Sequence, residues 1–228
     1  NTDSGYNRQK PIMTVSLRQA LVIAVVFSAC VTIAGHYLRP ERQLLVYIFK
    51  PLTTILILGV TLLAGRPFTD PYAGAIAVGL VFSLAGDIWL MLPGDRFVPG
   101  LASFLLALVC YAWAFRGGLS ASDFVLVLAF LIVVGAVTLR YLWPGVAAGL
   151  RGPFLVYSTV MILMCSLGAG RAMREPSVGS LAAAGGAILF MASDTMLGIN
   201  RFRRPFQLAH AAVLGTYFAG QLVISLSV

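Results

Sequence analysis

Two aspartates of this sequence lie inside long apolar stretches, where acidic side chains are rare. Asp87 stands in SLAGDIWLML and Asp194 in LFMASDTMLGI, while Lys50, in YIFKPLTT, is the only Lys or Arg well inside such a stretch. In a site of low dielectric, burial and mutual repulsion keep one carboxyl of a pair protonated while the other is ionised. These residue types therefore predict general acid–base catalysis by Asp87 and Asp194, with Lys50 in support.

A buried ion pair that only fixes helix packing is the alternative for these three residues. Two acids and one base, however, leave one acid without a partner. Ionisable groups inside a membrane cost about a few kcal/mol or more, and for that reason they usually mark a functional site. The other six acidic residues have ordinary positions, in loops, in the N-terminal segment or, for Asp123, at a helix start, where the helix dipole favours a carboxylate.

The composition places the chain in a membrane. Of its 228 residues, 59% are hydrophobic and 11% are charged, with a mean hydropathy of +0.91. Soluble domains have about a quarter charged residues, so we exclude a secreted disulfide scaffold, a disordered tail and a soluble nucleic-acid binder. The net charge of +8 is explained by loop arginines that face anionic lipid head groups, and we expect membrane lipid rather than nucleic acid as the partner.

Apolar runs separated by charges, prolines and glycines predict eight membrane-spanning helices. Each has about 18 to 22 residues, enough to cross roughly 30 Å of hydrocarbon. The short connections make consecutive helices antiparallel neighbours, so we expect an all-α, polytopic bundle. A polar segment, 1–16, precedes a single transmembrane domain, 17–228. The predicted spans are 17–35, 44–64, 73–92, 98–115, 121–139, 153–170, 177–198 and 207–227.

The direction of the spans brings the polar residues to one half of the bilayer. Spans 73–92 and 177–198 run the same way, and each aspartate lies about five residues before the end of its span, about 7 Å below the same membrane face. Lys50 lies about six residues inside a span that enters from that face. We expect a cavity that is lined with acids and open to one interface. Its supporting or substrate-binding residues are Tyr111, Tyr157, His210, Tyr217 and Gln221.

A weak internal repeat relates the two halves of the chain. The pattern AGDIWL at 85–90 returns as ASDTML at 192–197, and each copy is followed by Arg-Phe and then by a Tyr in the next span. The Asp-to-Tyr separation is 24 residues in one copy and 23 in the other. An offset of four helices preserves direction, so the repeat predicts a parallel 4+4 duplication, as in some transporters.

Loop charges leave the orientation in the membrane open. Seven Lys and Arg lie on one side and eight on the other, which does not satisfy the positive-inside rule in either direction. The even number of spans puts both termini on the same side. We expect an integral, multi-pass protein of the bacterial inner membrane, in an oligomeric state that the sequence does not reveal.

The chain offers few ligands for a metal ion. Hydrolytic zinc sites need about three His or carboxylate ligands, and His36 and His210 are the only histidines. His36 is expected to be an exposed residue of the first loop. The cysteines lie in apolar runs and are interpreted as small packing groups. We therefore expect no metal and no other cofactor.

Several motifs make the chain resemble the YhhN-like membrane proteins, the family that includes lysoplasmalogenase. The resemblance runs from about residue 45 to the C-terminus and contains both aspartate motifs in order. At Leu108, three residues before Tyr111, the chain departs from the family, which often has a histidine there. The matching pieces are KPLTT at Lys50, SLAGDIWLML, RFVPGLASFLLALVCYAWAF, GAILFMASDTMLGINRF, and TYFAGQLVI around Tyr217 and Gln221.

The resemblance implies hydrolysis of the vinyl ether bond of lysoplasmalogens, which are lysophospholipids. The products would be a fatty aldehyde and glycerophosphocholine or glycerophosphoethanolamine. The residues fit, because an enol ether resists base and is cleaved by protonation at carbon, which gives an oxocarbenium ion to which water adds. One Asp would donate the proton and the other would stabilise the cation and activate water, and their assignment stays open. Lys50 would favour the ionised form of the nearer carboxyl, or it would hold the substrate phosphate.

Two other functions are compatible with the same residues. A proton-coupled transporter or carrier of a lysolipid or another small amphiphile also needs buried acids and a base. A structural membrane protein would use these charges only for packing. The sequence has no reactive-serine elbow that would indicate an ester hydrolase, and the ether hydrolase is the function that we expect first.

Overall fold

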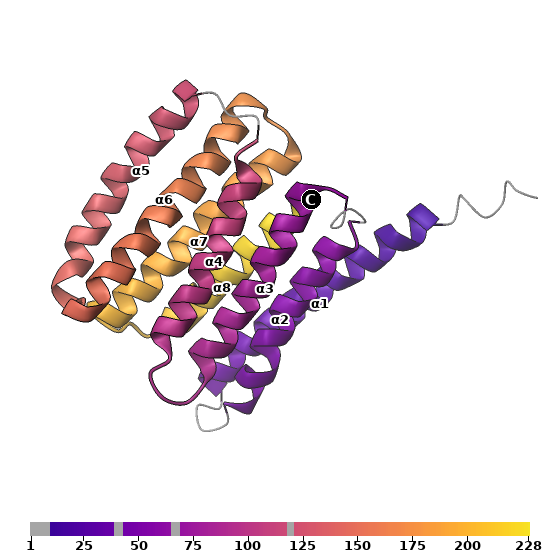
Figure 1. The fold of residues 1–228 in the computed structure, drawn as a ribbon. Helices are drawn as coiled ribbons and strands as arrows, with labels where there is room; N and C mark the ends of the chain where they lie inside the picture. The colour runs from indigo at the N-terminus through magenta and orange to yellow at the C-terminus, as the bar shows by residue number, and fades with distance from the viewer. Residues whose placement is uncertain (1–9, 39–42, 65–68, 118–120) are drawn as a thin grey trace, which may run out of the picture.

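The computed structural model describes residues 10–38, 43–64, 69–117 and 121–228. Within these ranges the chain forms eight α-helices and no strands (Figure 1). Two short 3-10 helices, η1 (Trp143–Gly145) and η2 (Ala148–Leu150), connect α5 to α6. The α-helices are α1 (Lys10–Leu38), α2 (Leu44–Leu62), α3 (Pro71–Met91), α4 (Phe97–Phe115), α5 (Ala121–Leu142), α6 (Arg151–Arg174), α7 (Val178–Phe202) and α8 (Ala209–Leu226).

Each of these helices, with η1 added to α5 and η2 to α6, gives an apolar segment of 18 to 27 residues, long enough to cross a membrane. Only 6% to 44% of each segment is buried inside the protein. The rest exposes large apolar side chains such as Leu126 and Phe130, as lipid-facing helix surfaces do. The prediction of an all-α, multi-pass membrane protein is confirmed.

The helix boundaries follow from local sequence. The Asp70 side chain caps α3 by accepting a hydrogen bond from the Tyr72 backbone N–H at 2.9 Å. In α7, the Ser177 and Ser180 side chains each bond the other's backbone N–H, which forms a capping box. Between α3 and α4, Gly94 has a φ of 84°, a left-handed turn that glycine adopts without steric cost. These short turns keep consecutive helices side by side.

Several helices extend further than the sequence predicts, α1 and α7 among them. Helix α1 begins at Lys10, so it includes residues 10–16 of the expected polar segment, whereas residues 1–9 lie outside the described ranges. Helix α7 continues to Phe202, four residues beyond the predicted end. The prediction ended the span 177–198 at the point where polar residues begin. Long polar side chains at a helix end reach the interface while the backbone stays helical, so the helix outlasts the apolar run.

Helix α3 packs closely on α4, and α7 packs closely on α8, through glycines. A Cβ atom on Gly86 would lie 2.6 Å from the ring of Phe104. A Cβ atom on Gly186 would lie 2.8 Å from the Gly220 carbonyl oxygen. Small residues permit such contact between membrane helices. The two helix pairs occupy corresponding places in the two halves of the chain, and the duplication itself stays a prediction.

Helix α5 lies at one edge of the bundle and packs mainly on α6 (Figure 1). Leu131 and Leu142 are its buried residues. Most of its other side chains face away from the protein. On the inner side of α5, a cavity lies between this helix and α4, α6 and α7.

Candidate active site between helices α4, α5, α6 and α7

The Asp87 carboxyl is buried and is held by three neighbouring side chains. Lys50 Nζ, from α2, lies 3.2 Å from Asp87 Oδ1. Thr54, one turn further along α2, donates a hydrogen bond to Asp87 Oδ2 at 2.6 Å. Tyr217 of α8 donates to the same oxygen at 2.8 Å. Asp87 therefore joins α2, α3 and α8, and the Lys50 cation balances its charge.

Asp194 has a different environment. Tyr157, from α6, donates a hydrogen bond to Asp194 Oδ2. The described residues form two ion pairs, Lys50–Asp87 and Arg201–Asp95, and neither includes Asp194. Of the three ionisable residues that the sequence places inside spans, Lys50 thus pairs with Asp87 and leaves Asp194 without a cation.

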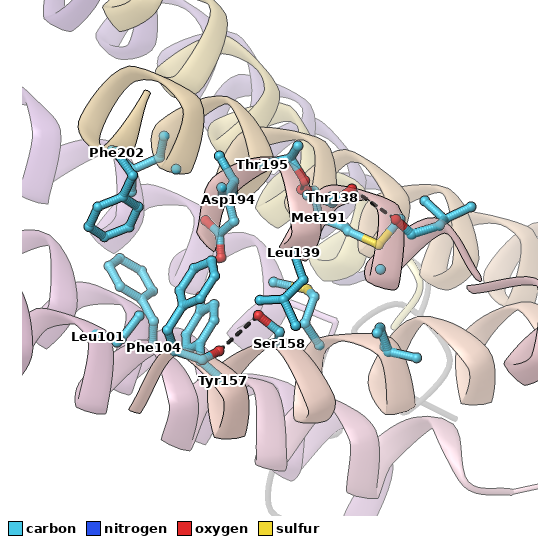
Figure 2. Close-up of a pocket in the computed structure, with 18 of the residues that line it drawn as sticks. Leu101, Phe104, Thr138, Leu139, Tyr157, Ser158, Met191, Asp194, Thr195 and Phe202 are labelled. Atoms are coloured by element: carbon cyan, nitrogen blue, oxygen red, sulfur yellow. Dashed lines mark hydrogen bonds between the residues drawn. The ribbon is translucent and has the colours of Figure 1, made fainter. Parts of the chain in front are cut away.

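Asp194 and Tyr157 line the cavity on the inner side of α5 (Figure 2). The space within its walls, together with the open space at its mouth, is about 920 Å³, and the wall is mostly apolar. Figure 2 shows the Asp194 side chain among aromatic and aliphatic groups. An apolar cavity with few polar groups suits a hydrocarbon chain that carries one reactive group. Further lining residues are Leu101, Phe104, Thr138, Leu139, Ser158, Met191 and Thr195.

The cavity lies in the half of the bundle that contains the α3–α4 and α5–α6 connections. Its residues come from the first halves of α4 and α6 and the last halves of α5 and α7, with Leu90 from the end of α3. At its outer end, the ring of Phe202 packs edge-on against the rings of Phe97 and Phe154, with centroid distances of 5.8 and 5.6 Å. These three rings form the cavity wall at this end.

Asp87 is not among the residues that line this cavity. Tyr217, which is bonded to Asp87, packs edge-on against Phe104 with 5.8 Å between ring centroids. Phe104 in turn lines the cavity. The surroundings of the two aspartates are therefore adjacent, and their action as an acid–base pair stays a prediction.

The two aspartates differ in their distance from the helix ends. Helix α3 ends at Met91, four residues after Asp87. Helix α7 ends at Phe202, eight residues after Asp194. The predicted equal spacing is wrong, because α7 continues beyond its apolar run. As a consequence, the last turn of α7 carries Arg201 past the outer end of the cavity.

Tyr111 and Gln221, which the sequence suggests as supporting residues, form a separate polar network. The Tyr111 hydroxyl donates to Gln221 Oε1 at 2.7 Å, and Gln221 Nε2 donates to Ser83 Oγ at 2.8 Å. All three side chains are fully buried between α3, α4 and α8. Their polar groups are satisfied within the network, and none of them lines the cavity.

His210 stacks on His36, with 4.2 Å between ring centroids and 5° between ring planes. The expectation that His36 is an exposed loop residue is wrong, because α1 continues to Leu38 and leaves the ring half-buried. Neither histidine lines the cavity. In the described part of the chain, no three His, Cys, Asp or Glu side chains gather as metal ligands would.

Sequence reasoning missed Thr54, which bonds Asp87, and the ion pair between Arg201 and Asp95. Thr54 follows Lys50 by four residues in KPLTT, a spacing that puts both on one face of α2 and provides a local signal. The Arg201–Asp95 pair gives no such signal, since 106 residues separate its members. Arg201 Nη2 donates to both oxygens of Asp95, at 3.0 and 2.9 Å.

Comparison with known proteins places the chain among membrane proteins of one family. The membrane protein YhhN of Escherichia coli O157:H7 is 30% identical over 204 residues, 89% of this chain and 95% of that protein. Lysoplasmalogenase TMEM86B of Homo sapiens is 36% identical over 159 residues, 68% of this chain and 64% of the human protein. Lysoplasmalogenase TMEM86A of Bos taurus is 33% identical over 178 residues, 72% of this chain and 68% of the bovine protein.

No solved structure matches this chain significantly. The sequence pattern of the YhhN family, in contrast, matches residues 45–228. That range begins in α2 and contains Lys50, both aspartates and every residue that lines the cavity. The protein belongs to the YhhN family.

Proposed function

We propose that this protein is a membrane-embedded ether hydrolase that cleaves the vinyl ether bond of lysoplasmalogens. The products are a fatty aldehyde and a glycerophospho head group such as glycerophosphocholine or glycerophosphoethanolamine. One observation carries the proposal: Asp194, which has no cationic partner among the described residues, stands in the wall of a mostly apolar cavity. The relatives named lysoplasmalogenase support the substrate class.

Asp194 supplies the proton in this proposal. An apolar wall without a counter-ion favours the neutral carboxylic acid over the carboxylate. Because Asp194 Oδ2 accepts the hydrogen bond from Tyr157, Oδ1 carries the proton. Transfer of that proton to the β-carbon of the enol ether gives an oxocarbenium ion. The Asp194 carboxylate left behind stabilises this cation electrostatically.

The same carboxylate acts as the base in the second half of the reaction. It removes a proton from the water that adds to the oxocarbenium carbon, which yields a hemiacetal and restores the acid. The hemiacetal then collapses to the fatty aldehyde and the glycerol hydroxyl. One water is consumed and no net proton is gained or lost, so a single carboxyl performs both steps.

Asp87 has a positioning role rather than contact with the reacting atoms. Its ion pair with Lys50 fixes the carboxyl that receives the Tyr217 hydrogen bond. Tyr217 supports Phe104 in the cavity wall. Both aspartates therefore matter for activity, but through different physical effects: Asp194 exchanges a proton with the substrate, and Asp87 maintains the shape and charge of the wall.

The cavity suits the apolar part of such a substrate. Along α6, its lining residues extend from Phe154 to Ile162, a rise of about 12 Å. Asp194 stands within this length, on the neighbouring helix α7. A lysolipid with its head group at the interface thus brings the first carbons of its alkenyl chain, which include the enol ether, into the cavity.

The decisive experiment is aldehyde release from a lysoplasmalogen by the purified protein. Wild type should release the aldehyde, and the saturated 1-O-alkyl analogue should stay intact because it has no double bond to protonate. Asp194→Asn removes the acidic proton at nearly constant size and should lower the rate by about 10²-fold or more. Asp70→Asn is the matched control, since Asn also caps a helix and should leave the rate unchanged.

Two outcomes would contradict the proposal. One is full aldehyde release by a correctly folded Asp194→Asn variant, which would remove Asp194 from the chemistry. The other is proton-coupled uptake of a lysolipid into liposomes by wild type with no product formed, which would indicate a carrier instead.

A further inference from the structure

An exposed ion pair stands beside the outer end of the cavity. Arg201, in the last turn of α7, donates to both carboxylate oxygens of Asp95 in the α3–α4 connection. The guanidinium carbon of Arg201 lies 3.9 Å from the centre of the Phe97 ring, and Phe97 lines the cavity. The side chains of Arg201 and Asp95 are 33% and 72% exposed. Both charges are therefore accessible to a ligand that enters the cavity from the interface.

Other cations of this half of the bundle have different partners. Lys50 is buried against Asp87 and does not line the cavity. Arg203 lies over the ring of Tyr141, 4.7 Å from its centre. Arg201 combines exposure to the interface with direct contact to the cavity wall. An exposed ion pair contributes little to stability, so exchanging its contacts for those of a ligand costs little.

The position of Arg201 on α7 matches the length of the substrate. Arg201 follows Asp194 by seven residues, which corresponds to two helical turns, the same helix face and about 10 Å of rise. About seven covalent bonds separate the protonated carbon of a lysoplasmalogen from its phosphorus, a length similar to this rise. A substrate with its enol ether at Asp194 therefore reaches Arg201 with its phosphate.

We propose that Arg201 and Asp95, the head-group pair, bind the two charges of a zwitterionic lysolipid head group. Arg201 takes the phosphate, which a guanidinium binds with two hydrogen bonds, and Asp95 takes the ammonium group. The placement of the lipid chain rests on the proposed function. Asp95 attracts an ammonium group, whereas the neutral glycerol of phosphoglycerol gives it no cation and leaves the repulsion between Asp95 and the phosphate uncompensated. The head-group pair therefore selects phosphocholine and phosphoethanolamine over anionic phosphoglycerol.

The test measures binding without catalysis. A saturated 1-O-alkyl lysolipid, which has no vinyl ether, is titrated into the purified full chain in detergent, with a phosphocholine or a phosphoglycerol head group. Wild type should prefer phosphocholine by about tenfold. Arg201→Gln should weaken the binding of both lipids by about tenfold. Asp95→Asn should weaken binding of the phosphocholine lipid and strengthen binding of the phosphoglycerol lipid. The control Arg203→Gln should change neither affinity.

A charge exchange separates lipid binding from a purely structural role. The double variant Asp95→Arg with Arg201→Asp restores an ion pair with its charges reversed. The head-group pair predicts that thermal stability is close to that of wild type while phosphocholine binding stays as weak as in Arg201→Gln. Recovery of binding together with stability would overturn the proposal, as would an unchanged head-group preference in Asp95→Asn.

The source of the phosphate is resolved by competition. Inorganic phosphate and chain-free glycerophosphocholine should compete weakly with the lysolipid, because neither fills the apolar cavity. Competition by inorganic phosphate as strong as that by the lysolipid would overturn a lipid site.

Failure of this proposal differs from failure of the hydrolase. If wild type binds with the expected preference but cleaves nothing, only the hydrolase fails. If wild type cleaves lysoplasmalogen and the Asp95 and Arg201 variants keep its KM and preference, only the head-group pair fails.

Discussion

Lys50 and Asp87 form an ion pair inside the bundle, with 3.2 Å between Nζ and Oδ1 and with side chains 11% and 1% exposed. They come from neighbouring helices, α2 and α3, so the pair joins two spans. Neither water nor lipid offers a replacement partner at this depth, and each charge depends on the other. Of the two roles that the sequence left open for Lys50, the pair favours action on the nearer carboxyl, and that role stays a prediction.

Replacing Lys50 alone should destabilise the protein. Lys50→Met leaves the buried Asp87 carboxylate without its cation, which should cost about 3–5 kcal/mol of unfolding free energy. Adding Asp87→Asn removes the unpaired charge and should recover much of this loss. The measurement is reversible unfolding in mixed detergent micelles. Equal destabilisation of the single and double variants would show that the two charges do not act as a unit.

Asp95→Asn tests the exposed Arg201–Asp95 pair by the same unfolding measurement. It breaks the Arg201 ion pair at a side chain that is 72% exposed. Because solvent and lipid head groups surround this pair, its loss should change the unfolding free energy by about 1 kcal/mol or less. A cost as large as that of Lys50→Met would contradict the difference in burial on which both predictions depend.

Tyr157 and Tyr111 are buried tyrosines that should respond differently to loss of the hydroxyl. Tyr157→Phe removes the hydrogen bond that holds Asp194 Oδ2 and should lower kcat for aldehyde release by about 10-fold to 10²-fold, since it misplaces the acid. Tyr111→Phe removes a bond to Gln221 in the separate network, which should cost about 1 kcal/mol of stability and leave kcat unchanged. Equal kcat values for the two variants would remove Tyr157 from the site.

Filling the inner end of the cavity should change the chain-length preference. Met191 lines the cavity one turn deeper than Asp194 along α7. Met191→Trp should raise KM for long-chain lysoplasmalogens by about tenfold and spare short-chain ones, because a pocket rejects chains that no longer fit. Leu126→Trp, on the exposed face of α5, is the control for bulk alone. The same KM increase in both variants, or none in either, would mean that the chain does not occupy this cavity.

The class of fold, and the residues that we expect to matter, can be predicted from the sequence. The lengths of the apolar runs gave eight spans, and the structure confirms them to within a few residues at most boundaries. This is possible because a bilayer imposes one length and internal backbone hydrogen bonding on every spanning segment. The same constraint makes Lys50, Asp87 and Asp194 conspicuous, since an ionisable residue in a span is rare.

The sequence did less well at the helix ends. It ended the span of Asp194 at 198, whereas α7 continues to Phe202, and it placed His36 in a loop although α1 includes it. Polarity marks where a helix leaves the hydrocarbon, not where its hydrogen bonds stop. The extra turn of α7 brings Arg201 to the outer end of the cavity.

Which charges meet depends on how the spans pack together. Nothing local in the sequence tells whether Lys50 pairs with Asp87 or with Asp194, because both aspartates occur in similar motifs with similar helix direction. The packing of α2 on α3 settles that choice in favour of Asp87, and the loose packing of α5 leaves a cavity beside Asp194. An apolar pattern shows that a helix lies in lipid. Contacts between distant spans depend on side-chain packing, and the spacing of residues along one span does not show which other span it will contact.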